Sequence, residues 1–323
     1  MIVVTGGAGF IGSCIVARLN SLGHDDLMVV DHFDGPDDMK RRNIENKHYR
    51  QYLDKAEFLE QVRSNRLPRS IRCVIHMGAC SSTTGTDPDY YEQNNFQYTR
   101  HLAQWCVEHR IPFIYASSAA TYGDGSRGYA DDEQSLQSLQ PLNLYGWSKH
   151  KFDLWVMDQG LRDHVVGLKF FNVFGPNEYH KGSMRSVVNK AYPGVASEGA
   201  ISLFKSYHPD YSDGEQQRDF IYVQDAVDVV LFFMDHPEIH GIYNVGTGTA
   251  HSWNELARAL FAAVGKAPNI HYIEMPEHLK ERYQYFTQAT VEKLRSVGFD
   301  RPWTSLEDAV RDYVGYLREG SYL

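Results

Sequence analysis

The chain opens with three glycines at intervals of three, placed directly after a short run of β-branched residues. The segment reads Met1-Ile-Val-Val-Thr-Gly6-Gly7-Ala-Gly9-Phe-Ile-Gly12 and continues as an amphipathic helical pattern. In such a turn Gly6 lets the strand turn tightly, Gly9 leaves room for a pyrophosphate, and Gly12 lets the helix pack closely. The helix then directs its free N–H groups at the phosphates. The segment therefore predicts a dinucleotide-binding turn.

A second strand-like run, Leu27–Val30, ends at Asp31, at the spacing that this fingerprint requires. An acidic residue there hydrogen-bonds the adenosine 2′-hydroxyl of NAD and repels the 2′-phosphate of NADP. Asp31 by itself therefore favours NAD. The basic stretch from Lys40-Arg41-Arg42 to Arg50 is either a solvated loop or a contact to cofactor phosphate.

Further strand-like runs, Val74–His76, Phe113–Ala116 and Val165–Phe170, alternate with helical stretches. This order predicts an α/β fold, a Rossmann doubly wound parallel sheet with crossover helices. After Asn172 the alternation of strand and helix patterns becomes irregular. The runs 219–223 and 225–231 then predict another strand and helix. We expect an NAD(P)-binding Rossmann domain at 1–171 with a return segment at about 218–246. Residues 172–217 and 247–323 are expected to form a smaller α/β substrate-binding lobe.

Charge and cysteine usage limit the classes of function. The 323 residues carry a net charge of −9, so no general basic face is offered to nucleic acid or to an anionic membrane. The four cysteines are scattered, which predicts neither a metal site nor a disulfide framework. A strand beginning at residue 2 and the absence of a long apolar run predict a cytoplasmic protein without a signal peptide or a membrane span.

Tyr145 and Lys149 are four residues apart in a predicted helix and therefore share one face. An ammonium beside the phenol favours phenolate, so Tyr145 could move a proton near neutral pH. Upstream, the strand from Phe113 ends in Ser117 and Ser118, at the sheet edge where ligands bind. Ser118 is a candidate donor to a reacting oxygen, and capping is the alternative role for either serine.

These motifs identify the chain as a member of the extended short-chain dehydrogenase/reductases, which it resembles nearly from end to end. Within them it is most similar to the ADP-glyceromanno-heptose 6-epimerases. The shared motifs are Gly6-x-x-Gly9-x-x-Gly12, Asn94-Asn95, Tyr145-x-x-x-Lys149, Phe171-Asn172-x-x-Gly175-Pro176, Arg218-Asp219-Phe220 and Asn244-Val-Gly246. The more specific matches are Gly78-Ala-Cys-Ser81-Ser-Thr-Thr84, His180-Lys181-Gly182-Ser183-Met184, Arg282-Tyr283-Gln284 and Phe286-Thr-Gln288.

The resemblance implies oxidation of the C6″ alcohol of the heptose to a ketone and return of the hydride to the other face. Tyr145, Lys149, Ser118 and Lys181 are the implied catalytic residues, with Lys181 as the second proton-transfer group. The same comparison implies NADP, with NAD as the alternative, because Lys40 and the nearby arginines can offset the charge of Asp31. A homo-oligomer and a role in lipopolysaccharide core synthesis are also implied.

Two sets of binding residues follow from the resemblance. The cofactor set is Gly6, Gly9, Phe10, Ile11, Gly12, Asp31, His32, Lys40, Lys55, Met77, Gly78, Ala79, Cys80, Ser81, Asn94, Tyr145, Lys149, Val173 and Lys181. The substrate set is Asn172, Ser183, Lys190, Phe204, Lys205, Ser206, Arg218 and Tyr283. Arg218 suits a diphosphate, and an ion pair with Asp219 or Asp225 is its structural alternative. Trp147, His180 and Cys80 are assigned no chemistry and are expected to shape the walls.

Three features distinguish a heptose 6-epimerase from related enzymes and from a regulator of the same fold. Ala119 and Ala120 stand where sugar dehydratases and related decarboxylases carry acids, which disfavours those reactions. A UDP-hexose 4-epimerase is the enzymatic alternative and is expected to lack the Lys181 segment. A nicotinamide-sensing regulator without catalysis is expected to lose Tyr145 or Lys149. The stretch 204–218 is longer than the family pattern, and Lys190 replaces an expected histidine, so base contacts there are open.

Overall fold

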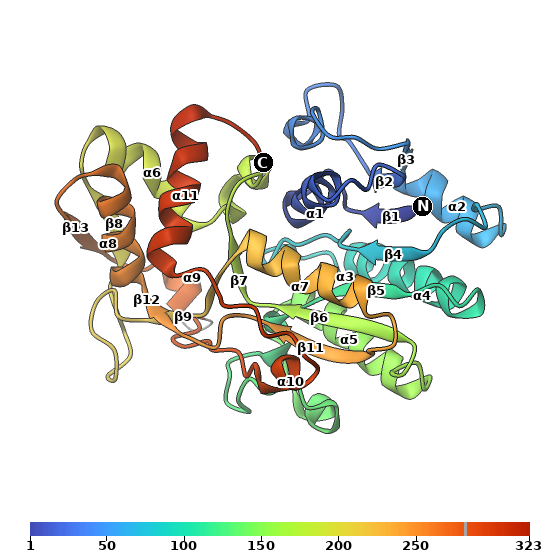
Figure 1. Ribbon diagram of the computed structural model, residues 1–323. Helices are drawn as coiled ribbons and strands as arrows, with labels where there is room; N and C mark the ends of the chain where they lie inside the picture. The colour runs from blue at the N-terminus through green and yellow to red at the C-terminus, as the bar shows by residue number, and fades with distance from the viewer. Residues whose placement is uncertain (281–282) are drawn as a thin grey trace.

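The computed structural model describes residues 1–280 and 283–323. Seven parallel strands form the main sheet in the order β11-β6-β5-β4-β1-β2-β3. These strands are β1 Ile2–Thr5, β2 Leu27–Asp31, β3 Gln51–Asp54, β4 Cys73–His76, β5 Phe113–Ser118, β6 Val165–Phe170 and β11 Gly241–Val245. The predicted Rossmann sheet is confirmed, and Figure 1 shows it on one side of the molecule.

Two strands of this sheet were not predicted. β3 pairs with β2 at one edge, and β11 pairs with β6 at the other. β3 has a single buried residue, Leu53, because its outer side lies at a sheet edge, so its apolar signal is weak. The predicted strand 219–223 is β10, Phe220–Tyr222, which pairs with β7, Asn172–Phe174, outside the main sheet.

Helices cover both faces of the sheet. One face packs against α1, Phe10–Ser21, and α7, Val223–Asp235, while the other packs against α2, Lys55–Arg63, α4, Tyr98–Glu108, and α5, Leu144–Asp158. β1 shows the division, since Ile2 and Val4 belong to the first core and Val3 to the second. Alternate residues of a strand point to opposite faces, so a strand covered on both faces is apolar throughout.

Shorter elements connect the sheet and its helices. They are η1 Met39–Asn43, α3 Pro88–Tyr91, η2 Glu92–Gln97, η3 Ala119–Tyr122, η4 Glu133–Ser138, η5 Tyr179–Met184 and α10 Glu292–Ser296. In the part of the chain that the structure describes, no helix is both long enough and apolar enough to cross a bilayer.

A smaller α/β unit lies beside the sheet in Figure 1. It contains the parallel pair β8–β13, the antiparallel pair β9–β12 and the helices α6, α8 and α11. The bounds are α6 Val187–Ser197, β8 Ile201–Phe204, β9 Gln217–Arg218, β12 His251–Ser252, α8 Trp253–Val264, β13 Ile270–Ile273, α9 Glu277–Lys280 and α11 Leu306–Glu319. The domain boundaries given above stay a prediction.

The strand order reverses between β1 and β4, because the chain runs from β1 outward through β2 and β3 and then returns to the other side of β1. In open α/β sheets the crevice at the carboxyl ends of the strands beside such a point receives the ligand. We therefore expect the binding site at the residues that follow β1, β2, β4 and β5.

Candidate active site

The glycine turn after β1 has no space for a side chain at Gly6 or at Gly12. Gly6 adopts φ +64°, and a Cβ on Gly12 would lie 2.1 Å from the carbonyl oxygen of Gly6. α1 begins at Phe10 without a side-chain cap and without an acidic residue in its first turn. Its free N–H groups and the positive end of its dipole therefore favour an anion. The turn fits a dinucleotide pyrophosphate.

Asp31 at the end of β2 is held by three donors. Its carboxylate accepts hydrogen bonds from the backbone N–H of Ala8 at 2.9 Å and of His32 at 2.8 Å, and Lys40 Nζ lies 3.2 Å away. Lys40 also donates to the His32 carbonyl oxygen and lies 3.7 Å from Asp38. The negative charge of Asp31 is thus already paired with a cation.

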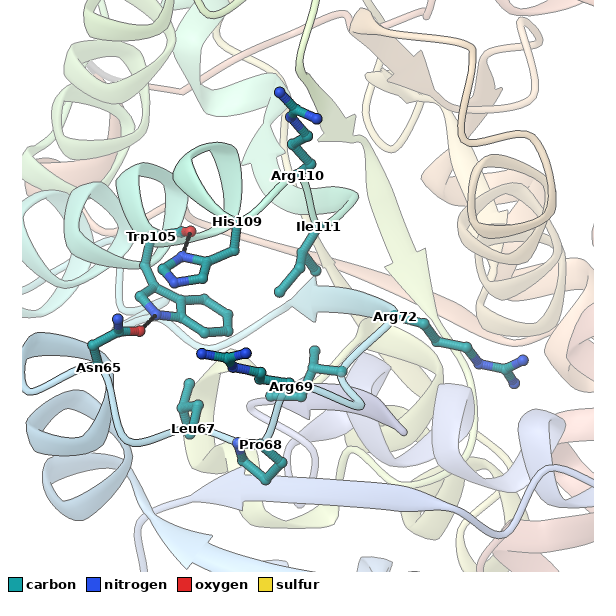
Figure 2. Close-up of a pocket in the computed structure, with 10 residues that line it drawn as sticks. Asn65, Leu67, Pro68, Arg69, Arg72, Trp105, His109, Arg110 and Ile111 are labelled. Atoms are coloured by element: carbon teal, nitrogen blue, oxygen red, sulfur yellow. Dashed lines mark hydrogen bonds between the residues drawn. The ribbon is translucent and has the colours of Figure 1, made fainter.

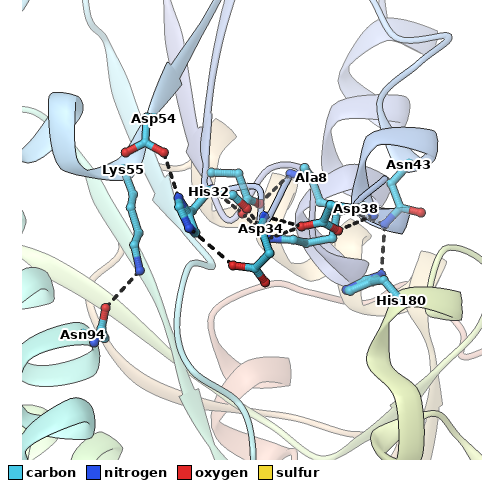
Figure 3. A network of polar contacts seen from close by, with 11 residues as sticks. Ala8, His32, Asp34, Asp38, Asn43, Asp54, Lys55, Asn94 and His180 are labelled. Carbon is cyan, nitrogen blue, oxygen red and sulfur yellow. Dashed lines mark hydrogen bonds and ion pairs between the residues drawn. The ribbon is translucent and has the colours of Figure 1, made fainter. Parts of the chain in front are cut away.

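Further polar contacts extend from this point along the crevice, as Figure 3 shows. His32 lies between Asp54, at 2.9 Å, and Asp34, at 3.4 Å. Lys55 Nζ donates to the side-chain oxygen of Asn94 at 3.0 Å.

A cavity of about 1030 Å³ runs along the carboxyl ends of the strands. It brings together all the predicted catalytic and cofactor residues, together with three of the predicted substrate residues. The predicted residues that line it are Gly6, Gly9, Phe10, Ile11, Gly12, Asp31, His32, Lys40, Lys55, Met77, Gly78, Ala79, Cys80, Ser81, Asn94, Ser118, Tyr145, Lys149, Asn172, Val173, Lys181, Ser183 and Lys190.

Tyr145 and Lys149 lie on α5, as predicted, and Asn143 caps this helix by accepting a hydrogen bond from the Gly146 N–H at 2.8 Å. Lys149 Nζ donates to the carbonyl oxygen of Ala116 on β5 at 2.6 Å. Burial lowers the pKa of Lys149 to about 8, and the nearby Asp153 opposes that shift. A lysine in this range exchanges protons close to neutral pH.

The pKa of Tyr145 differs from the sequence-based expectation. Burial raises it, and the hydrogen bond with Ser118 lowers it only in part. Lys149 is directed at a backbone carbonyl, so it does not offset the cost of burying a phenolate. In this structure Tyr145 is therefore a neutral phenol at neutral pH. The Ser118 hydroxyl, which also accepts from the Ala120 N–H at 3.1 Å, lies beside it.

Lys181 lines the same cavity from η5, a segment remote in sequence from α5. Its Nζ lies 4.9 Å from the centre of the Phe10 ring, next to the glycine turn. Burial lowers the pKa of Lys181, with Glu178 raising it and Lys190 lowering it further. Lys181 is partly buried and lines the cavity, so it is not a fully exposed surface lysine.

The other five predicted substrate residues do not line this cavity. Arg218 is buried, donates to the carbonyl oxygens of Gln217 and Gln284, and lies 5.2 Å from the Tyr283 ring and 5.8 Å from the Trp253 ring. Trp253 does line the cavity, and its indole N–H donates to the Tyr283 hydroxyl at 2.9 Å. Arg218 and Tyr283 thus lie directly behind a cavity wall.

The alternative ion pairs of Arg218 are not formed. The carboxylate of Asp219 accepts hydrogen bonds from Thr247, Gly248 and Ala289, and that of Asp225 accepts from Thr304. Phe204, Lys205 and Ser206 lie at the end of β8, where Lys205 is paired with Glu274 at 2.7 Å. Arg282 lies outside the described residues.

Some lining residues were not found from the sequence. Trp253 and Leu256 begin α8, and Met184 and Arg185 follow the predicted Ser183. Their position depends on how the smaller unit packs, which no local pattern signals. His180 and Cys80 do shape the walls, but Trp147 does not: it is 47% exposed and is absent from the described lining.

A second cavity, of about 410 Å³, lies where the chain enters β4 and β5. Figure 2 shows Arg69 and Trp105 among its lining residues. Because the strands are parallel, this cavity lies at their amino ends, whereas Tyr145 lies at their carboxyl ends. None of the predicted site residues lines it.

The comparisons agree with this geometry. The NAD dependent epimerase/dehydratase family matches residues 2–246, and the chain belongs to it. More narrowly, it belongs with the ADP-L-glycero-D-manno-heptose-6-epimerases. The relative of that name from Nitratidesulfovibrio vulgaris is 50% identical over 97% of both chains.

Two solved structures are informative. The Helicobacter pylori ADP-L-glycero-D-manno-heptose-6-epimerase has a TM-score of 0.81 and 27% identity, covering 98% of this chain and 96% of that one. The Thermus thermophilus UDP-glucose 4-epimerase in complex with NAD has a TM-score of 0.75 and 25% identity, covering 98% of each chain.

Proposed function

We propose that the chain converts ADP-D-glycero-D-manno-heptose to its L-glycero epimer at C6″, through a transient ketone, with bound NADP. The observation that carries this proposal is the meeting of two proton-transfer groups in one cavity. Tyr145 enters it from α5 and Lys181 from η5. Returning a hydride to the opposite face of a ketone requires the sugar to turn, and a second group then serves the new position of the oxygen.

The nicotinamide supplies the hydride acceptor and donor when the cofactor is bound. The glycine turn and the N-terminus of α1 would hold its pyrophosphate, and the end of β2 would hold its adenosine ribose. The choice of NADP rests on Lys40. Because Lys40 already pairs with Asp31, the carboxylate is screened and an additional phosphate meets a cation.

Tyr145 is the first proton-transfer group. Ser118 donates to the substrate oxygen while Tyr145 exchanges a proton with it, and the Lys149 ammonium, held by the Ala116 carbonyl oxygen, lies one helical turn further along α5. Because burial keeps the resting phenol neutral, the phenolate that accepts the alcohol proton needs a positive charge beside it, which the oxidised nicotinamide would supply. Lys181, whose pKa is lowered by burial, exchanges a proton in the second orientation.

Arg218 supports a diphosphate substrate. Its guanidinium is buried, and among the described residues it is hydrogen-bonded only to carbonyl oxygens and forms no ion pair. A buried cation without a carboxylate is costly, and a diphosphate that displaced the Trp253 wall would offset that cost. Asn172, Ser183 and Lys190 line the cavity where the sugar would lie. A homo-oligomer in the cytoplasm stays a prediction.

The test is proton NMR of purified protein with ADP-D-glycero-D-manno-heptose and no added cofactor. We expect conversion to the L-glycero epimer, and a rate about 10²- to 10⁴-fold lower in Tyr145→Phe and in Lys181→Met. Lys151→Met is the matched control, because Lys151 is exposed on α5 and pairs with Glu92. Wild-type activity in Lys181→Met would reject the second proton-transfer group. Turnover of UDP-galactose in place of the heptose would favour the 4-epimerase alternative.

A further inference from the structure

Glu178 is a buried carboxylate that the proposed mechanism does not use. Its side chain accepts hydrogen bonds from the Ser186 N–H at 2.6 Å, from the Ser186 hydroxyl and from the Tyr313 hydroxyl at 2.9 Å. The residue is 0% exposed, and within the described chain no cation is ion-paired with it. A charge buried among neutral donors is expensive to keep, so its position calls for a reason.

The carboxylate joins the two ends of the segment that carries Lys181. The backbone N–H of Lys181 donates to the Glu178 carbonyl oxygen at 3.0 Å, which starts the turn. The chain reverses at Gly182, where φ is +55°, and returns to Ser186, whose side chain caps α6 by accepting from the Asn189 N–H. Glu178 therefore closes the base of the loop 178–186.

Tyr313 attaches this closed loop to the smaller unit. It lies on α11, is fully buried, and its hydroxyl donates to Glu178 while accepting from the Asn189 side-chain amide at 2.6 Å. The loop is thus tied to two helices at the point opposite Lys181. This arrangement limits how far the Lys181 side chain can move from the cavity.

The charges around Lys181 are otherwise mostly positive. Lys190 acts on it from α6, and Arg185 lies beside Lys190. On the cofactor side, His180 faces Lys40, Asp31 and Asp38. In the described chain Glu178 is the carboxylate that acts on Lys181, and it favours the ammonium form.

We infer that Glu178 is a positioning residue for the second proton-transfer group: it clamps the Lys181 loop against the cavity and places a buried negative charge at the base of that loop. The inference rests on the proposed function, because it concerns proton transfer by Lys181. It assigns no contact between Glu178 and the substrate.

The test compares pH profiles of the epimerisation rate at saturating substrate. Glu178→Gln keeps the shape of the side chain and removes its charge, so we expect a rate at least about tenfold lower. We also expect a shift in the limb of the pH–rate profile at which Lys181 loses its proton. That limb should move to lower pH, because the Glu178 carboxylate, which favours the ammonium form, is gone. Tyr313→Phe removes the two hydrogen bonds of the Tyr313 hydroxyl and keeps the Glu178 charge, so the position of this limb should not change.

The outcomes separate the two claims. If Lys181→Met retains activity, the proposed function fails. If Lys181→Met is inactive while folded Glu178→Gln keeps the wild-type rate and limb, only the present inference fails. Should Glu178→Gln not fold, the double variant Ser186→Ala/Tyr313→Phe takes its place, since it removes the two side-chain hydrogen bonds of the clamp but keeps the carboxylate. A lower rate with an unmoved limb supports the clamp, and a wild-type rate overturns it.

Discussion

Lys169 and Asp153 form an ion pair in which Nζ and Oδ2 are 2.6 Å apart and both side chains are fully buried. Asp153 stands four residues after Lys149 on α5 and also accepts hydrogen bonds from Tyr115 and Ser117 on β5. Lys169 belongs to β6 and also donates to Thr121. The pair therefore joins α5, β5 and β6 directly behind the residues that hold Tyr145 and Ser118.

Removing one partner of this pair should be strongly destabilising. Lys169→Met leaves the Asp153 carboxylate buried without its cation, and we expect the free energy of unfolding to fall by about 3–5 kcal/mol. Urea denaturation followed by circular dichroism measures it. The double variant Lys169→Met/Asp153→Leu removes both charges and should recover part of the loss. A single variant as stable as the wild type would contradict the prediction.

Alanine should be tolerated very differently at Gly12 in the glycine turn and at Gly315 in α11. In Gly12→Ala the new Cβ would lie 2.1 Å from a backbone oxygen, so α1 must shift. We expect a loss of about 1–3 kcal/mol in stability and a clear loss of cofactor binding. Gly315 in α11 is the control, because nothing lies within 4 Å of its Cβ position. Gly315→Ala should be neutral or stabilising by up to about 1 kcal/mol.

His76 makes stability depend on pH. It is fully buried between Thr5 and Thr99, and burial lowers its pKa to about 3. The unfolded chain therefore binds one more proton than the folded one between about pH 6.5 and pH 3, so stability falls as the pH falls through that window. The slope from this group is at most about 1.4 kcal/mol per pH unit.

Urea midpoints measured from pH 7 to pH 4 check this contribution. His76→Gln keeps polar atoms between the two threonines and should reduce the slope. The exposed residue His271 on β13 is the control, and His271→Gln should leave the slope unchanged. An equal slope in wild type and His76→Gln would show that His76 is not the responsible group.

Lys40 should determine the choice of cofactor. Lys40→Met leaves Asp31 without its cation and removes a donor for a 2′-phosphate. We expect NADP affinity to fall about 10- to 100-fold, as for loss of a charged hydrogen bond, with a smaller change for NAD. Asp31→Asn should shift the preference toward NADP. Titration calorimetry with both cofactors measures the ratio, and an equal loss for both would argue against this role.

Much of the cofactor side could be predicted because it is local in sequence. Gly6 to Gly12 form one continuous turn, and the spacing of Tyr145 and Lys149 places both on one helix face. The direction of the Tyr145 pKa could not be predicted in this way. It depends on burial and on the Ala116 carbonyl that takes the Lys149 ammonium, and both come from packing.

The strands show the same limit. β11 begins with a glycine and contains Asn244, a polar residue of a type that is mostly exposed in proteins. Its amide is satisfied by the Tyr122 hydroxyl and by backbone carbonyls of Tyr129 and Thr290, so it can be buried. These hydrogen-bond partners lie far away in the sequence, so no local pattern predicts them.

By itself the sequence determined the parallel sheet, the dinucleotide turn and the helix bearing Tyr145, because each depends on the order and spacing of neighbouring residues. The family resemblance, and no local pattern, predicted Lys181 in the same site, and packing brings it there. The tertiary structure alone decided that Arg218 has no acidic partner among the described residues and that Glu178 closes the Lys181 loop. Burial and charge pairing arise between segments remote along the chain. Their energies are therefore set by packing rather than by local pattern.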